Sequence, residues 1–362
     1  MKESVYQGFR CLSSIALAAS TFAAVAFAQD FDINNHPDPD RPVFAVLGNT
    51  RPDLAGASSL PTWTGTFVFD TSTFAFTMVG TDPATTNVTT TIPAVIIPVK
   101  LIISSRTGRT STWDPLTVPP NTGGLTAIQN TVQSPMFDST TTYVQGGTNV
   151  GTTQYDDAYQ RANFWTSVKT NSNYHLLLSP TVLSEVTLSP PSNKGKTARA
   201  FGISVAEVDL NWIDQQFQSI ISGLGLQASQ LPIFVTYNTY LTESGCCIGG
   251  YHSANGGQTY MHFSYISTPG VFSQDVSALS HEVGEWTDDP FVNNRTACGN
   301  LENGDPLETG PDFGGFPYVL HGFTYNLQDL VTLPYFGAPP STSVNNFFTF
   351  QGQTLSVCQN GA

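Results

Sequence analysis

The pattern of apolar and polar positions predicts strands up to about residue 103 and both helices and strands from about residue 156 onward. Runs rich in β-branched and apolar residues predict strands at 66–69, 74–79, 95–103, 231–241 and 259–266. Apolar residues at helical spacing predict helices at 156–168 and 205–224. Residues 106–152 show no clear period and fit long loops or short strands, and the proline-rich stretch 29–60 fits an irregular arm.

A further helix is predicted after the last of these strands. Its apolar stripe would face a core and consists of Val276, Leu279, Val283 and Trp286. Ser273 or Asp275 can cap its start, and Pro290 disfavours helical geometry in the residue before it. The opposite face carries polar side chains, so this helix is a candidate for chemistry.

The polar face contains the motif H-E-x-x-E, formed by His281, Glu282 and Glu285. Residues four apart lie one turn apart on one helix face, so His281 and Glu285 can bind the same ion. Glu282, next to the first ligand, can then reach a metal-bound water as general base. Glu302, in the segment that follows, supplies a third ligand. The alternative interpretation is a solvated acidic helix with a core histidine.

Charge favours the metal-binding interpretation. The formal net charge is −14, and Arg295 is the only lysine or arginine from residue 200 onward. The acidic cluster therefore has almost no cationic side chain to pair with, and a bound cation would balance it. The same charge argues against binding to nucleic acid or to an anionic membrane, because no basic patch exists to release counterions.

The start of the chain resembles an export signal. Lys2 and Arg10 flank an apolar run at 11–27, and Ala26-Phe27-Ala28 is an A-x-A cleavage site. We therefore expect residues 1–28 to be a signal peptide, and the mature protein to be secreted or periplasmic, with no membrane contact after cleavage. An uncleaved membrane anchor is the alternative.

Cysteine usage agrees with export. Four cysteines remain after the signal segment, namely Cys246, Cys247, Cys298 and Cys358. An even number in an oxidising compartment predicts disulfide bonds. Three connectivities are possible, of which we favour Cys298 with Cys358, leaving Cys246 and Cys247 as a vicinal pair or in another arrangement.

Three strings together resemble a group of secreted bacterial proteins with an H-E-x-x-E-x-x-x-D-P signature. They are TQYDDAYQRANFW at 153–165, Gly250-Tyr251-His252-Ser253 after the adjacent cysteines, and SHEVGEWTDDP at 280–290. The cysteine, Tyr-His and H-E-x-x-E part is also similar to the plant EXORDIUM, or phosphate-induced, proteins. The resemblance covers 95–358. It implies an α+β fold with a zincin-like metal-binding domain at 151–362, preceded by a β-rich, loop-rich region at 29–150.

The wider resemblance is to the gluzincin metallopeptidases, whose motif is H-E-x-x-H with a distant glutamate. On that comparison His281 and Glu302 match metal ligands, Glu282 matches the general base, and Asp305 takes a place that orients His281. Glu285 departs from the motif, because a histidine is expected there. Two carboxylates and one histidine favour Zn²⁺ less strongly than two histidines and one carboxylate do, so Mn²⁺ and Ca²⁺ become competitors.

Three other residues are weaker candidates for the site. Asp289 is an alternative ligand, although its place before Pro290 suits helix termination equally well. His252 and His321 are possible hydrogen-bond donors to the transition state.

The sequence thus predicts a secreted metal-dependent hydrolase, a peptidase acting on peptide or protein substrates with Zn²⁺ as its first-choice ion. The alternative is a non-catalytic secreted or cell-wall interaction protein in which the metal is structural.

Overall fold

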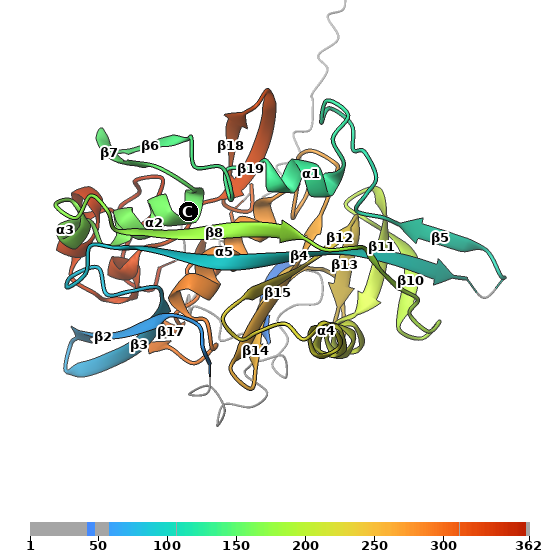
Figure 1. The fold of residues 1–362 in the computed structure, drawn as a ribbon, viewed down its shortest axis with the longest axis horizontal. Coiled ribbons are helices and arrows are strands. Elements are labelled where there is room, and N and C mark those ends of the chain that lie inside the picture. The colour runs from blue at the N-terminus through green and yellow to red at the C-terminus, as the bar shows by residue number, and fades with distance from the viewer. Residues whose placement is uncertain (1–41, 48–57, 106, 311, 360–362) are drawn as a thin grey trace, which may run out of the picture.

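The computed structural model describes residues 42–47, 58–105, 107–310 and 312–359 (Figure 1). The signal peptide expected at 1–28 and its cleavage site lie outside these residues. No helix in the described ranges is both long enough and apolar enough to span a membrane.

One mixed sheet forms the centre of the described molecule (Figure 1). Its strands run in the order β10 (Gly195–Ala200), β11 (Ile203–Asp209), β13 (Thr239–Thr242), β14 (Ile248–Asn255), β15 (Gln258–Tyr265), β12 (Leu231–Tyr237), β4 (Thr89–Ser104) and β5 (Thr110–Trp113). Three further strands pair beside this path, namely β1 (Val43–Leu47) on β14, and β8 (His175–Val182) and β9 (Val186–Leu188) on β4.

The expected α+β zincin-like fold is wrong. The structure is mostly β, with 39% strand and 19% helix, and its central sheet curves until it nearly closes on itself. Strand β4 connects the expected N-terminal region to the rest of the sheet. Its 16 residues pair with β5 and also with the later strands β8, β9 and β12. The expected regions 29–150 and 151–362 therefore contribute strands to the same sheet.

Two cores cover the two faces of the sheet, and strand alternation assigns side chains to each. Ile96, Ile233 and Met261 face the core that contains α5 (Ser277–Asp288). Their neighbours Ile97, Phe234 and Tyr260 face the core that contains α4 (Leu210–Leu224). Because successive side chains point to opposite faces, His252 on β14 lies on the α5 side and Tyr251 on the α4 side.

Helix α4 is shorter than the pattern predicted. Val205 and Val208 belong to strand β11, and the helix starts only after Asp209, whose carboxylate accepts a hydrogen bond from the backbone N–H of Trp212 at 2.8 Å. Gly225 ends the helix with φ +63°, a conformation that glycine adopts without steric cost. Apolar spacing alone did not distinguish the strand from the helix that follows it.

The remaining elements surround the sheet. Among the described residues, the other helices are α1 (Ala127–Val132), α2 (Tyr155–Asn163) and α3 (Trp165–Val168). The paired strands outside the sheet are β2 (Thr62–Phe69) with β3 (Ser72–Val79), β6 (Thr142–Gln145) with β7 (Thr148–Thr152), β16 (Arg295–Thr296) with β17 (Gly299–Asn300), and β18 (Gly315–Leu320) with β19 (Phe323–Gln328). Short 3-10 turns lie at Asp305–Leu307, Leu333–Phe336, Pro340–Thr342 and Val344–Asn346.

Candidate metal centre

Helix α5 carries the H-E-x-x-E motif and is buried along its whole length. Its apolar stripe packs into the core, as the sequence predicted, and Trp286 also donates a hydrogen bond from Nε1 to Thr259 at 2.9 Å. No side chain caps the helix start at Val276, although the Asp275 carboxylate accepts a hydrogen bond from the Val276 N–H. The helix ends at Asp288, two residues before Pro290.

One group of ligand atoms forms around His281. Its Nε2 lies 3.0 Å from Glu285 Oε1 and 3.6 Å from Asp305 Oδ1. The three residues come from α5 and from the segment after β17, and together they can hold a metal ion. The backbone N–H groups of Gly304 and Asp305 donate to Glu285 Oε1 at 3.2 and 3.3 Å, which fixes this carboxylate against the segment.

Gly304 permits the close approach of that segment to the helix. A Cβ at this position would lie 2.3 Å from His281 Nδ1 and 2.6 Å from its Cε1. Its φ of −89° suits any residue, so the glycine is required by the contact with the imidazole ring rather than by backbone conformation.

A second group forms around His252, on β14. Its Nδ1 lies 3.2 Å from Glu282 Oε2 and 3.5 Å from Glu285 Oε2, and these residues also form a possible metal-binding group. Glu285 thus contacts both histidines. A Cβ at Gly250 would lie 2.8 Å from Glu282 Oε1, so a small residue on β14 is needed for Glu282 to reach this place.

Glu302 lies on the other side of the His252 ring, with Oε2 3.7 Å from His252 Nε2. Burial raises the pKa of Glu302 well above its usual value, and the charges of Glu285, Asp289 and Asp305 raise it further. The structure therefore brings Glu302 into the acidic cluster, beside His252. It groups Asp305, rather than Glu302, directly with His281 and Glu285.

Many polar atoms of the cluster are buried without a hydrogen-bond partner in the described structure. They are His252 Nε2, His281 Nδ1 and Nε2, Glu282 Oε1, Glu285 Oε2, both carboxylate oxygens of Glu302, and Asp305 Oδ2. Leaving such groups unpaired costs about 1–3 kcal/mol each, and more when they are charged. Imidazole nitrogens and carboxylate oxygens that converge in this way are the usual ligands of divalent metal ions.

The electrostatics of the cluster also favour a cation. Burial lowers the pKa of His252, but Glu282 and Glu285 outweigh this and raise it to about 9. Burial raises the pKa of Glu282 to about 7, against the opposing effect of His252. Burial raises the pKa of Glu285, but the charges and hydrogen bonds of His281 and His252 together outweigh this and lower it to about 2. The acidic groups thus stabilise positive charge on the imidazoles, and a metal ion can provide that charge instead.

The remaining predicted candidates lie at different places. Asp289 accepts hydrogen bonds from the backbone N–H groups of Asn293 and Asn294, so its carboxylate holds the turn after the helix. His321 is exposed in the turn between β18 and β19, where its Nε2 lies 2.9 Å from Asp138 Oδ2. The structure does not group either residue with the metal-binding side chains.

Sequence reasoning missed the polar contacts behind the helix. Asn303 Nδ2 donates to the carbonyl oxygen of Gly284 at 3.0 Å, to Asp288 Oδ2 at 2.9 Å and to the Tyr159 hydroxyl at 3.0 Å. Gln160 donates to the other oxygen of Asp288. Helix α2, which contains Tyr159 and Gln160, thus supports both the motif helix and the segment that carries Glu302 and Asp305. The only sequence signal for this contact was the string at 153–165.

The four cysteines lie in pairs at disulfide distance. Cys298 and Cys358 are joined with Cα atoms 5.1 Å apart, which is the pairing the sequence favoured. Cys246 and Cys247 form the second pair, immediately before β14. The first bond holds the C-terminal segment next to Cys298, four residues before Glu302. The second pair precedes the strand that carries His252.

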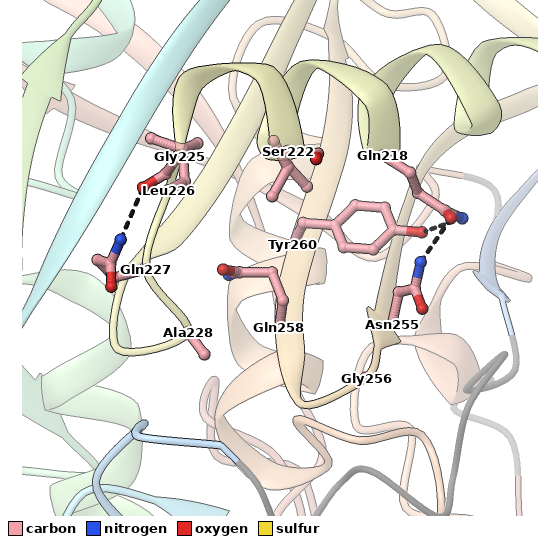
Figure 2. A pocket seen from close by; sticks show the side chains of 11 residues that line it. Gln218, Ser222, Gly225, Leu226, Gln227, Ala228, Asn255, Gly256, Gln258 and Tyr260 are labelled. Atoms are coloured by element: carbon pink, nitrogen blue, oxygen red, sulfur yellow. Dashed lines mark hydrogen bonds between the residues drawn. The ribbon is translucent and has the colours of Figure 1, made fainter.

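A separate groove of about 460 Å³ lies between the end of α4 and the turn of β14 and β15 (Figure 2). Neutral side chains line it. Gln218 donates a hydrogen bond to the Tyr260 hydroxyl and accepts one from Asn255 (Figure 2). Tyr260 points to the α4 face, opposite to His252, and no residue of the acidic cluster lines the groove. The groove is therefore separate from the candidate metal centre.

Comparison with protein-family models, with curated proteins and with solved structures finds no significant match to this chain.

Proposed function

We propose that the protein is a secreted metal-dependent hydrolase that cleaves peptide bonds, with Zn²⁺ as the preferred ion. The observation that carries the proposal is the set of buried imidazole and carboxylate atoms around α5 that have no hydrogen bond within the described residues. His281, Glu285 and Asp305 would hold the ion, and Glu302 adds a further carboxylate to the cluster. The relation to EXORDIUM and to the secreted bacterial proteins belongs to this proposal and rests on the sequence strings alone.

The residues present suit hydrolysis. A bound divalent ion supplies a Lewis acid that lowers the pKa of water. Glu282 Oε2 lies beside His252, whereas its Oε1 has no hydrogen-bond partner among the described residues and is free to accept a proton. Glu282 would take the proton of the attacking water and pass it to the leaving amine, so that the products are a carboxylate and an amine.

The second candidate is an interaction protein in which the same ion is structural. Complete burial of His252, Glu282 and Glu302 favours it, because structural metal sites are closed and catalytic sites keep an open position.

Glu282→Gln separates the two candidates. A hydrolase should keep its metal content and thermal stability with this change but lose about 10²- to 10⁴-fold of its turnover, because the base is removed while size is kept. Turnover would be measured on mixed peptide substrates at matched metal loading, with Glu207→Gln, a carboxylate paired with Lys196 at 2.8 Å, as control. Wild-type hydrolysis that Glu282→Gln leaves unchanged contradicts the mechanism. No hydrolysis by any form supports the interaction protein.

A further inference from the structure

Within the described residues, one side of strand β14 is covered mainly by a short N-terminal strand, β1. The other side of β14 pairs with β15 from Gly250 to Asn255. On the covered side, β13 reaches β14 only at Ile248. Within the described ranges, β1 is the strand that pairs along the rest of this side, up to Ser253. Without β1, the backbone of β14 would present unpaired N–H and C=O groups beside His252.

The backbone of β1 is fixed at several points. It runs parallel to β14, with Ala45 opposite Tyr251 and Leu47 opposite Ser253. The N–H of Val43 donates to the carbonyl oxygen of Cys247 at 2.8 Å, and the Ser253 hydroxyl donates to the carbonyl oxygen of Leu47 at 2.8 Å. These are the contacts by which an extended peptide adds to the edge of a sheet.

Phe44 inserts its ring between this edge and the metal centre. The ring lies 4.2 Å from the His281 ring and 4.5 Å from the Phe272 ring, measured between centroids, and it is fully buried. Gly249 makes room for it, because a Cβ there would lie 2.8 Å from Phe44 Cε1. The N–H of Phe44 donates to Glu308 Oε2 at 3.0 Å. Gly249, Phe272 and His281 therefore enclose a position for one aromatic side chain, called the aromatic seat below, directly against a predicted metal ligand.

We propose that this side of β14 is the binding site for an extended peptide substrate with an aromatic residue, and that β1 of the same chain occupies it. The inference rests on the proposed function for the chemistry that follows binding, but the binding itself is independent of it. It explains how a hydrolytic centre is fully buried, because Phe44 covers His281 in the position that a substrate side chain would take. Backbone pairing supplies affinity, and the aromatic seat supplies selectivity.

The test uses a fluorescently labelled hexapeptide with the sequence of residues 42–47, Pro-Val-Phe-Ala-Val-Leu, and measures its binding by anisotropy. Phe44→Ala removes the ring that holds β1 in place. This variant should bind the peptide about tenfold more tightly than the wild type, because β1 competes less for the same edge. Phe74→Ala removes a ring from the hairpin β2–β3 and should bind like the wild type.

Two further comparisons test the aromatic seat. A peptide with alanine in place of phenylalanine should bind Phe44→Ala about tenfold more weakly. Gly249→Val in the Phe44→Ala background fills the seat and should abolish binding of the original peptide. If Phe44→Ala does not fold, Phe44→Leu, which keeps an apolar side chain, is compared with the wild type in the same way. Its affinity for the hexapeptide should increase by a smaller factor.

The outcomes separate this inference from the proposed function. A folded, metal-loaded Phe44 variant that binds the hexapeptide no better than wild type overturns the inference, even if other peptides are hydrolysed. Binding that depends on the phenylalanine and on Gly249, with no hydrolysis at full metal loading, supports the binding site and contradicts the hydrolase.

Discussion

At the residue scale, the spacing of the motif was sufficient to predict that His281 and Glu285 meet, because both lie on one short helix. The partnership of His252 with Glu282 was not predictable in the same way. The two residues are 30 positions apart and meet only because β14 and α5 pack together on one face of the sheet. His252 was proposed from the sequence as a transition-state donor, and its place beside Glu282 is compatible with that prediction.

Gly304 gives a prediction at this scale. Gly304→Ala should weaken metal binding by about tenfold or more, because the added methyl group displaces the His281 ring. The dissociation constant for Zn²⁺ would be measured by competition with a chromophoric chelator.

Gly223→Ala is the matched control for this change. Gly223 lies in α4, where a Cβ would meet nothing within 4 Å, so affinity should stay at the wild-type value. Unchanged affinity in Gly304→Ala would mean that His281 is not a ligand in the geometry described.

At the element scale, the hydrophobic pattern predicted the existence of most strands and of the motif helix. It failed where a strand buried on both faces precedes a helix. Val205 and Val208 fit a helical stripe, but in strand β11 they point to opposite cores, and the cap at Asp209 decides where the helix begins. The contact between α2 and α5 could not be predicted from periodicity either, because it consists of buried polar groups rather than an apolar stripe.

That polar contact leads to a second prediction. Asn303→Ala should lower the free energy of unfolding by about 1–3 kcal/mol, because it leaves the buried Asp288 carboxylate and the Gly284 carbonyl with one partner fewer. It should also weaken Zn²⁺ binding, because Asn303 lies between Glu302 and Asp305 in the chain and fixes that segment against α5.

The comparison variant is Asn211→Ala, which removes an exposed amide that donates to Glu243. It should change neither stability nor metal affinity appreciably. If Asn303→Ala lowers stability but retains wild-type metal affinity, the segment is not positioned by this side chain, and α2 has only a structural role.

At the scale of the whole molecule, the fold class was the part of the sequence-based account that failed. The N-terminal strands were expected to form a region of their own. Instead β4 lies within the central sheet, with Ile96 opposite Ile233 on one side and Val182 on the other. The sequence of β4 indicates a buried strand, but it contains no information about its pairing with β8 and β12, because their residues are more than 80 positions away.

The same scale explains why the cluster could hold a cation. Six acidic and imidazole side chains from α5, β14 and the segment after β17 are brought together by the packing of the whole sheet. They are His252, His281, Glu282, Glu285, Glu302 and Asp305, and the side chains of the two histidines are fully buried. These side chains form ion pairs with one another, but several of their buried atoms have no hydrogen bond within the described residues, and a bound cation would contact such atoms.

The most direct test of this account is the metal content of the purified protein, measured by mass spectrometry after dialysis against Zn²⁺ and then against metal-free buffer. We predict about one divalent ion per chain in the wild type and loss of the ion in His281→Ala and in Glu285→Ala. His262→Gln replaces a buried histidine outside the cluster, one that lies 2.9 Å from Thr236 Oγ1, and should retain the ion. A metal-free wild type, or full occupancy in both ligand variants, would contradict the assignment of this cluster as a metal centre.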